Sequence, residues 1–283
     1  MKITNLHPSM ISSPYLACWN PLKRRFGGRI GRRMPFWTRA NNFGDLLGPV
    51  VANALLEQHN LKQHPAVDFP DTETSPKLLS VGSVLHFARD GDVVWGAGRN
   101  GKIAEQQHRF SDLDVRMTRG PKTRNFLRSR GIAVPEIYGD PALLVPTLFK
   151  DTIATWPKRR HTITLVPNLN DPPLQHPGAY VVNPRSELWS VLQAIYSSEI
   201  IVSSSLHGFI MAEAFNRPAR LVASGSEPPF KYEDYFLGTG RNEAVFHGSV
   251  QEALSAPDHP PAVFDSTAMI NAFPVDLFSN TDV

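Results

Sequence analysis

The residues best suited to chemistry lie at 203–208, Ser-Ser-Ser-Leu-His-Gly, between an apolar strand predicted at 199–202 and a helix predicted at 209–215. Hydroxyl side chains, the amides of a helix start and one imidazole occur together in this turn. Because backbone N–H groups at a helix N-terminus attract anions, the turn suits an anionic substrate. We predict that it forms one wall of an active site, with His207 as the chemically active side chain. The binding residues predicted beside it are Ser204, Ser205, Leu206 and Gly208.

A glycine-rich loop at 96–101 follows another predicted strand. Its G-x-G-x-x-G pattern allows backbone amides to approach a ligand closely, so we predict that Gly96, Gly98 and Asn100 bind substrate. A dinucleotide site requires an acidic residue at the end of the next strand, and that strand ends at Arg119 instead. The loop therefore disfavours NAD and predicts a different anionic ligand.

Charged and amide side chains occur at three further element ends. Arg119 lies between a predicted strand and a helix starting at Pro121, where its planar guanidinium can hold a carboxylate or phosphate. Asp140 follows a short strand predicted at 134–138 and is either a turn cap or a site residue. Asn42 and Asp45 open an amphipathic helix; taken alone, Asp45 is better explained as a helix-start carboxylate than as a catalytic group.

Composition excludes several classes of protein. The chain has 283 residues, 41% of them hydrophobic, and a net charge of only +3, which argues against a polycationic protein. The single cysteine, Cys18, excludes an internal disulfide, and the 10 histidines show no spacing typical of metal ligands. We expect no metal and no cofactor. No signal peptide or membrane-spanning run is apparent in the sequence, so we expect a cytoplasmic protein.

The segment 19–39 combines basic residues with aromatic side chains and glycines. Such a segment can dock peripherally on the anionic lipids of the inner membrane, where each charge near the surface contributes about 1 kcal/mol. A solvated basic loop or a lid over an anionic site is the simpler interpretation. Nucleic-acid binding is disfavoured, because no known nucleic-acid-binding module surrounds the segment.

Strands and helices alternate on both sides of a polar break at 150–160. Strands are predicted at 77–81, 92–95, 113–118 and 134–138 before the break, and at 161–166, 180–182, 199–202 and 219–223 after it. A helix at 186–197 is expected to start with Ser186 as its cap. We predict an α/β protein with an N-terminal segment at 1–40, a first domain at 41–150 and a second at 151–283, facing each other across a cleft.

Six segments, taken in order, resemble the polysaccharide pyruvyl transferase family. They are NFGD (42–45), VVWGAGRNG (93–101), TRGPKTRNFL (118–127), YGDPALLVP (138–146), SSLHGFIMAEA (204–214) and KYEDYFLGTGR (231–241). Each motif is short, and their order is the specific feature. The resemblance covers residues 41–241 and leaves the basic N-terminal segment and the tail outside it.

The resemblance implies two Rossmann-like domains in a glycosyltransferase B-like arrangement. It also implies transfer of pyruvate from phosphoenolpyruvate onto two hydroxyls of a hexose, giving a cyclic ketal on a bacterial polysaccharide or lipid-linked precursor. The family residues that act on phosphoenolpyruvate correspond here to Arg119, His207 and Lys231. His207 is the first candidate for general acid or base, or holds phosphate as a cation. The acid that protonates the methylene carbon is sought among Asp45, Asp140 and Glu213.

Two alternatives remain open from the sequence. A nucleotide-sugar glycosyltransferase of the same fold would consume a sugar nucleotide instead of phosphoenolpyruvate. A non-catalytic polysaccharide-assembly protein would bind the acceptor and release no phosphate.

Overall fold

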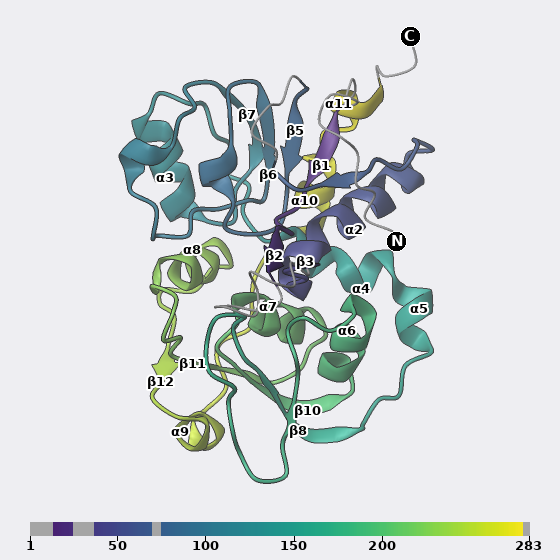
Figure 1. The fold of residues 1–283 in the computed structure, drawn as a ribbon, viewed down its shortest axis with the longest axis vertical. Coiled ribbons are helices and arrows are strands. Elements are labelled where there is room, and N and C mark those ends of the chain that lie inside the picture. Colours follow the sequence, from purple (N-terminus) through teal and green to yellow (C-terminus); the bar gives the residue numbers. More distant parts are fainter. Residues whose placement is uncertain (1–13, 25–36, 70–74, 280–283) are drawn as a thin grey trace.

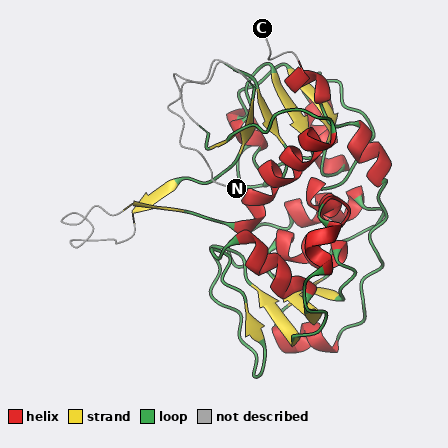
Figure 2. Cartoon of the chain, turned by 90° about the vertical axis from the view of Figure 1, so that its right-hand side faces the viewer, coloured by secondary structure: helices red, strands yellow, loops and turns green. Residues whose placement is uncertain are grey.

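The computed structural model describes residues 14–24, 37–69 and 75–279. Two five-stranded parallel sheets lie at opposite ends of the molecule, with helices between them (Figures 1 and 2). The first sheet has the order β4 (Ala66–Val67), β1 (Tyr15–Ala17), β5 (Lys77–Leu79), β6 (Asp92–Trp95) and β7 (Leu113–Met117). The second has the order β12 (Phe246–His247), β11 (Ala219–Val222), β10 (Ser198–Ser203), β8 (His161–Val166) and β9 (Tyr180–Val181). The α/β prediction is confirmed.

Both sheets have the same topology. When each sheet's strands are ranked by chain position, both orders read 2-1-3-4-5. In this doubly wound order the connections leave the first strand toward opposite sides of the sheet, and a crevice forms between the first and third strands at their carboxyl ends. Those strands are β1 and β5 in the first sheet, and β8 and β10 in the second. Topology therefore predicts a ligand site where the loops after these four strands meet.

The helices have the bounds α2 (Phe43–Gln58), α3 (Pro121–Ser129), η4 (Pro141–Leu144), α4 (Val145–Leu148), α5 (Lys150–Ala154), α6 (Leu188–Tyr196), α7 (Leu206–Ala214), α8 (Phe230–Gly238), α9 (Val250–Ser255), α10 (Ser266–Asn271) and α11 (Val275–Ser279). Several of them, α2, η4, α6 and α7 among them, place apolar side chains in a core between the sheets, whereas α3 and α9 pack in separate clusters of the first and second sheet. We call each five-stranded sheet, together with its connecting loops and the elements packed on it, a unit, numbered as the sheets are. Two further short 3-10 helices, η2 (Leu85–Phe87) and η3 (Glu105–Gln107), lie in loops of the first unit.

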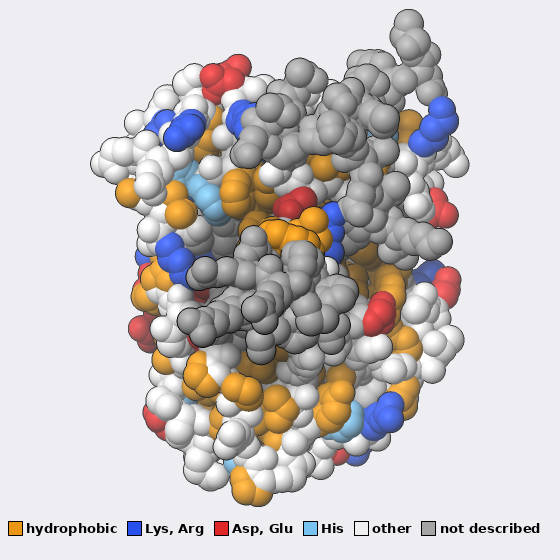
Figure 3. Space-filling model, viewed as in Figure 1, with side chains coloured by type: hydrophobic (Ala, Val, Ile, Leu, Met, Phe, Trp, Pro, Cys, Tyr) orange, Lys and Arg blue, Asp and Glu red, His pale blue; other side chains and the backbone are white. Residues whose placement is uncertain are grey.

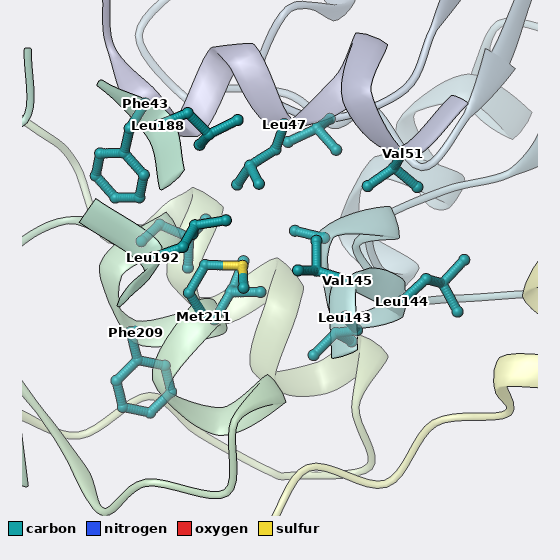
Figure 4. Packing of buried hydrophobic residues seen from close by; sticks show 14 of the residues in the cluster. Phe43, Leu47, Val51, Leu143, Leu144, Val145, Leu188, Leu192, Phe209 and Met211 are labelled. Carbon is teal, nitrogen blue, oxygen red and sulfur yellow. The ribbon is translucent and has the colours of Figure 1, made fainter. Parts of the chain in front are cut away.

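One hydrophobic core joins the two units. Figure 4 shows Leu47 of α2 and Leu143 of η4 packed in the same cluster as Leu192 of α6 and Met211 of α7. All four side chains are almost fully buried. Since burying one such side chain contributes about 1.5–3 kcal/mol, the cluster holds α2 firmly against the second unit.

The C-terminal helices pack on the first sheet rather than the second. Trp95 at the end of β6 donates a hydrogen bond from Nε1 to the Met269 carbonyl oxygen of α10 at 2.9 Å. Its ring meets Phe273 edge-on at 5.0 Å between centroids. The second domain was predicted to cover residues 151–283. In the structure the last helices of that range contact the first unit.

Three local predictions need correction. Residues 1–40 were expected to lie outside the first sheet, yet Tyr15–Ala17 form β1; a three-residue strand is too short to show periodicity. The strand predicted at 134–138 is reduced to one bridge between Thr118 and Tyr138, because Pro135 has no N–H to donate. Helix α6 is capped by Glu187, which accepts from the Ser190 N–H, and not by Ser186.

An antiparallel pair, β2 (Leu22–Arg24) and β3 (Trp37–Arg39), stands away from both sheets (Figure 2). Much of the basic segment predicted at 19–39 lies outside the described residues, since 25–36 are not described. Among the side chains described on the face in Figure 3, basic and acidic groups are scattered over both units. Within the described ranges, no helix is long and apolar enough to span a bilayer.

Candidate active site

A cavity of about 250 Å³ lies between the two units, where the loops of both sheets meet. The loops after β1, β5, β8 and β10 all reach it, as the topology predicts. From the first unit it is lined by Trp19, Asn42, Asp45, Ser83, Val84, His86, Phe87, Asn100 and Lys102. From the second it is lined by Asn168, Leu169, Asn170, Ser205, Leu206, His207, Glu227 and Lys231.

The turn after β10 is fixed by its own hydroxyl groups. Ser203 is buried, and its Oγ lies 2.8 Å from the Val166 carbonyl oxygen while accepting from the Ser205 N–H at 3.0 Å. Ser205 caps α7, accepting the Gly208 N–H at 3.3 Å. These bonds begin α7 at Leu206 and place His207 in its first turn, at the cavity wall.

The His207 ring is held between the two units. Its Nε2 lies 3.6 Å from Asp140 Oδ2, which is beyond hydrogen-bond length and within ion-pair distance. Both atoms are buried and lack a hydrogen-bond partner. On the opposite side the ring abuts Gly44 of α2, where an added Cβ would lie 2.2 Å from Nδ1. Nε2 thus faces Asp140 and Nδ1 faces the backbone of α2 at Gly44, while the residue lines the cavity.

Asp140 has the capping role that the sequence left open, and it also lies beside His207. Its Oδ1 caps η4 by accepting the Ala142 N–H at 3.0 Å. Its Oδ2 is the atom that faces His207. The carboxylate is fully buried, so it acts on the cavity only through the imidazole.

Asp45 is the carboxyl group that lines the cavity from the first turn of α2. Asn42 Nδ2 donates to its Oδ2 at 2.7 Å. Burial raises the pKa of Asp45 above its ordinary value, while the nearby His207 and the Asn42 hydrogen bond act in the opposite direction. A raised pKa favours the protonated carboxylic acid, which is the form that can donate a proton.

Two lysines meet across the cavity at one carboxylate. Glu227 Oε2 lies 3.0 Å from Lys231 Nζ of α8, and its Oε1 pairs with Lys102 from the glycine-rich loop. Burial lowers the pKa of Lys231, and Glu227 partly opposes that effect. The three side chains form a lysine–glutamate–lysine bridge between the units. The two ammonium groups of this bridge are placed to bind an anionic ligand as well as Glu227.

Arg119 lies behind this cavity and does not line it. Its guanidinium is 1% exposed and donates to Asp234 at 3.1 Å, to the Arg99 carbonyl oxygen at 2.7 Å and to Ser83 Oγ at 2.8 Å. Asp234 also accepts the Thr123 N–H of α3 at 3.0 Å. Arg119 therefore reaches the cavity through Ser83, and its charge is already matched by a buried carboxylate.

The comparison with known proteins identifies the family. The family model for polysaccharide pyruvyl transferases matches residues 42–226, which is more than half of this chain. The chain belongs to the polysaccharide pyruvyl transferase family.

One curated relative and one solved structure are similar to this chain. The succinoglycan biosynthesis protein ExoV of Rhizobium meliloti (strain 1021) is 28% identical over 211 residues, covering 71% of this chain and 62% of that protein. The aligned part thus spans about three-fifths of the relative's length. An uncharacterized protein from Klebsiella pneumoniae has a TM-score of 0.50 at 10% identity, over 84% of this chain and 94% of its own. That likeness concerns the fold alone.

The cavity brings together many of the residues that the family motifs predict. Those that line it are Asn42, Asp45, Asn100, Ser205, Leu206, His207 and Lys231, with Asp140 directly behind His207. The position of Lys231 supports its match to the family lysine.

Other residues predicted to bind substrate do not line the cavity. Gly98 makes room for Arg119, because an added Cβ would lie 2.5 Å from the guanidinium carbon. Gly96 packs on Pro141, and Gly208 packs on Ser203. Ser204 uses its Oγ to accept the Asn168 N–H at 2.9 Å. All four have packing roles that support the cavity wall.

Sequence reasoning missed several residues in and around the cavity. Glu227 and Lys102 lie far apart in the chain and become partners only through the fold. His86 lines the cavity, and burial lowers its pKa to about 4, so its imidazole is neutral at neutral pH. Gly44 lies in the NFGD motif and Asp234 in the KYEDYFLGTGR motif. Membership in these motifs was the one feature of the sequence that could have pointed to the two residues.

Proposed function

We propose that this protein transfers the pyruvyl group of phosphoenolpyruvate onto two hydroxyls of a hexose, forming a cyclic ketal. Family membership supports the reaction class, and the single observation that carries the rest is the cavity at the carboxyl ends of both sheets. It combines lysines, an imidazole and a carboxyl group of raised pKa. The shared strand order of the two sheets supports a glycosyltransferase B-like arrangement.

In the proposed complex, Lys102 and Lys231 hold the donor's anionic groups. The donor has a phosphate and a carboxylate, and fixed cations in a partly buried site bind such groups strongly. The Ser205 side chain and the first amides of α7 add neutral donors at the same wall. Arg119 contributes its charge from behind Ser83.

Two side chains carry the proton transfers. Asp45 protonates the methylene carbon, which leaves a cationic centre at C2; of the three carboxyl candidates it alone lines the cavity. Asp140 lies behind His207, and Glu213 is engaged by Arg241 and Tyr235. A sugar hydroxyl then attacks C2 as the His207 imidazole accepts its proton.

The remaining steps balance the reaction. The C2–O bond to phosphate breaks, phosphate leaves with the bonding electron pair, and the second hydroxyl closes the ring on C2. Of the two protons lost by the hydroxyls, one replaces the proton that Asp45 gave to carbon, and the other leaves with phosphate. The products are the pyruvate ketal and inorganic phosphate.

The acceptor is proposed to be a hexose of a polysaccharide precursor, in free or lipid-linked form. A cytoplasmic location with peripheral contact to the inner membrane through residues 19–39 is part of the same proposal. It is supported by exposed apolar side chains on the projecting strand pair, where Leu22 is 55% and Trp37 is 52% exposed.

The direct test is an incubation with phosphoenolpyruvate and a panel of glycosides that includes lipid-linked oligosaccharides. We expect phosphate release coupled to a product heavier than its acceptor by one pyruvate less one water, measured by mass spectrometry. Sugar nucleotides serve as competing donors in parallel reactions. Glycosyl transfer from a sugar nucleotide, or no mass gain on any acceptor, would contradict the proposal.

We expect Lys231→Met to weaken phosphoenolpyruvate binding about tenfold to a hundredfold, because a charge-assisted contact contributes about 1.5–3 kcal/mol. Glu227→Gln should leave binding intact or strengthen it, since it removes the carboxylate that competes for both lysines. Isothermal titration calorimetry measures both. Lys150→Met on exposed α5 is the matched control. Equal affinities for Lys231→Met and the control would remove Lys231 from the site.

A further inference from the structure

A second cavity of about 400 Å³ lies beside the first. Its walls include Asn41, Leu46 and Val50 from around the start of α2, and Glu187, Leu188 and Trp189 from the start of α6. It is therefore formed by both units, like the candidate active site.

The first turn of α2 separates the two cavities. Asn42 and Asp45 line the first, whereas their chain neighbours Asn41 and Leu46 line the second. The sulfur atom of Cys18, which also lines the second cavity, contacts the Asp45 carbonyl oxygen at 3.4 Å. A ligand in the second cavity thus lies one helical turn from the carboxyl group assigned as the proton donor.

The second cavity is lined by both aromatic and polar side chains. Trp189 is half-buried, and its ring is held edge-on by Phe149 at 4.9 Å and Trp156 at 6.3 Å between centroids. The polar lining groups include the Asn41 amide and the Glu187 carboxylate, whose Oε2 also accepts the Ser190 N–H. An aromatic face packs against the C–H groups of a sugar ring, while amide and carboxylate oxygens accept hydroxyl protons.

The charge balance favours a neutral ligand. In the first cavity two lysines share one glutamate. Among the described residues that line the second cavity, the cationic one is Arg39. Its Nη1 lies 3.8 Å from Asp68 Oδ2 and donates to the Asn20 carbonyl oxygen at 2.7 Å. Its charge is largely balanced, so the cavity suits hydroxyl groups better than phosphate.

The backbone at Asn41 fixes one polar group in place. Asn41 adopts a left-handed conformation with φ of 54°, and its N–H donates to Asn20 Oδ1 at 2.8 Å. Asparagine tolerates this conformation better than most residues do. Its side chain is therefore presented to the cavity from a rigid turn.

We propose that the second cavity is the acceptor subsite, where a sugar unit of the acceptor packs on Trp189 and bonds to Asn41 and Glu187. This proposal rests on the proposed function, because it names where the acceptor of that reaction binds. An acceptor of two or more sugars then spans from this cavity, over the first turn of α2, to His207.

The test is saturation-transfer-difference NMR with free gluco- and galacto-oligosaccharides of one to four units, without phosphoenolpyruvate. We expect signals from the longer oligosaccharides with the wild-type protein. Trp189→Ala should weaken binding about tenfold, as expected for loss of an aromatic contact of about 1.5 kcal/mol. Asn41→Gly, which keeps the left-handed backbone and removes the amide, should weaken it as well.

The control is Tyr180→Ala, which removes an exposed aromatic ring from β9. Phosphoenolpyruvate affinity, measured on the same samples, should change less than about twofold in all three variants, and thermal melting verifies that each is folded. Unchanged oligosaccharide binding in Trp189→Ala and Asn41→Gly would overturn the subsite. So would the absence of oligosaccharide binding by a wild-type protein that binds phosphoenolpyruvate. Loss of phosphoenolpyruvate binding in the wild type would instead count against the proposed function.

Discussion

Replacing His207 by asparagine is expected to lower kcat by about 10²–10⁴, the range for loss of a general acid or base. Phosphoenolpyruvate binding should change by less than about tenfold, because the lysines remain. The reason is geometric: Asp140 and Gly44 hold the His207 ring at the cavity wall. Steady-state kinetics of phosphate release, together with direct titration of the donor, separates the two effects.

Asp140→Asn tests the contribution of the carboxylate that faces His207 Nε2. The amide oxygen can still accept the Ala142 N–H, so the cap of η4 is kept while the charge facing Nε2 is lost. We expect a smaller fall in kcat than for His207→Asn and little change in KM for either substrate. His161→Asn, at a ring stacked on Tyr180, is the matched control and should behave like wild type.

Near-native kcat in His207→Asn would exclude a role of His207 in proton transfer.

Arg119→Met is expected to destabilise the protein by about 3–5 kcal/mol, the cost of leaving a buried carboxylate without its partner. Asp234 is 0% exposed, and it faces Arg119 at 3.1 Å. Arg119 therefore has a structural role as well as the predicted role toward the substrate, which stays a prediction. Urea unfolding measures the change in the free energy of unfolding.

The double variant Arg119→Met, Asp234→Asn separates charge burial from catalysis. It removes both charges and keeps an acceptor for the Thr123 N–H. We expect it to recover much of the lost stability without recovering activity, because the cation behind Ser83 is still missing. If the single variant is as stable as wild type, the buried pair does not support the fold. If the double variant is fully active, Arg119 has no part in the reaction.

The sequence predicts the alternation of strands and helices well, and it predicts by residue type the turn at 203–208, part of which lines the cavity. Strand β8 was predicted with its observed bounds, because a short segment rich in β-branched residues after a polar break favours a strand. Strand β1 was missed, since three residues next to Pro14 carry no periodic signal. The turn at 203–208 was recognisable because small hydroxyl residues before a helix have a known physical use.

Pairs that exist only through tertiary structure were not predictable. Nothing near Lys102 in the chain indicates Glu227, and nothing near Gly44 indicates that an imidazole packs on it. Arg119 was assigned from its position at a strand end, which correctly placed it near the site. Its burial against Asp234 depends on the packing of α8 on α3, which local sequence does not reveal.

The return of α10 to Trp95 joins the first and last parts of the chain around one core. The first sheet cannot complete its packing until residues 266–279 have been synthesised, since those helices pack on it. Co-translational folding of the first unit is consequently incomplete on the ribosome. Heat or denaturant should melt the whole chain in one cooperative transition, with no stable half-molecule at intermediate conditions.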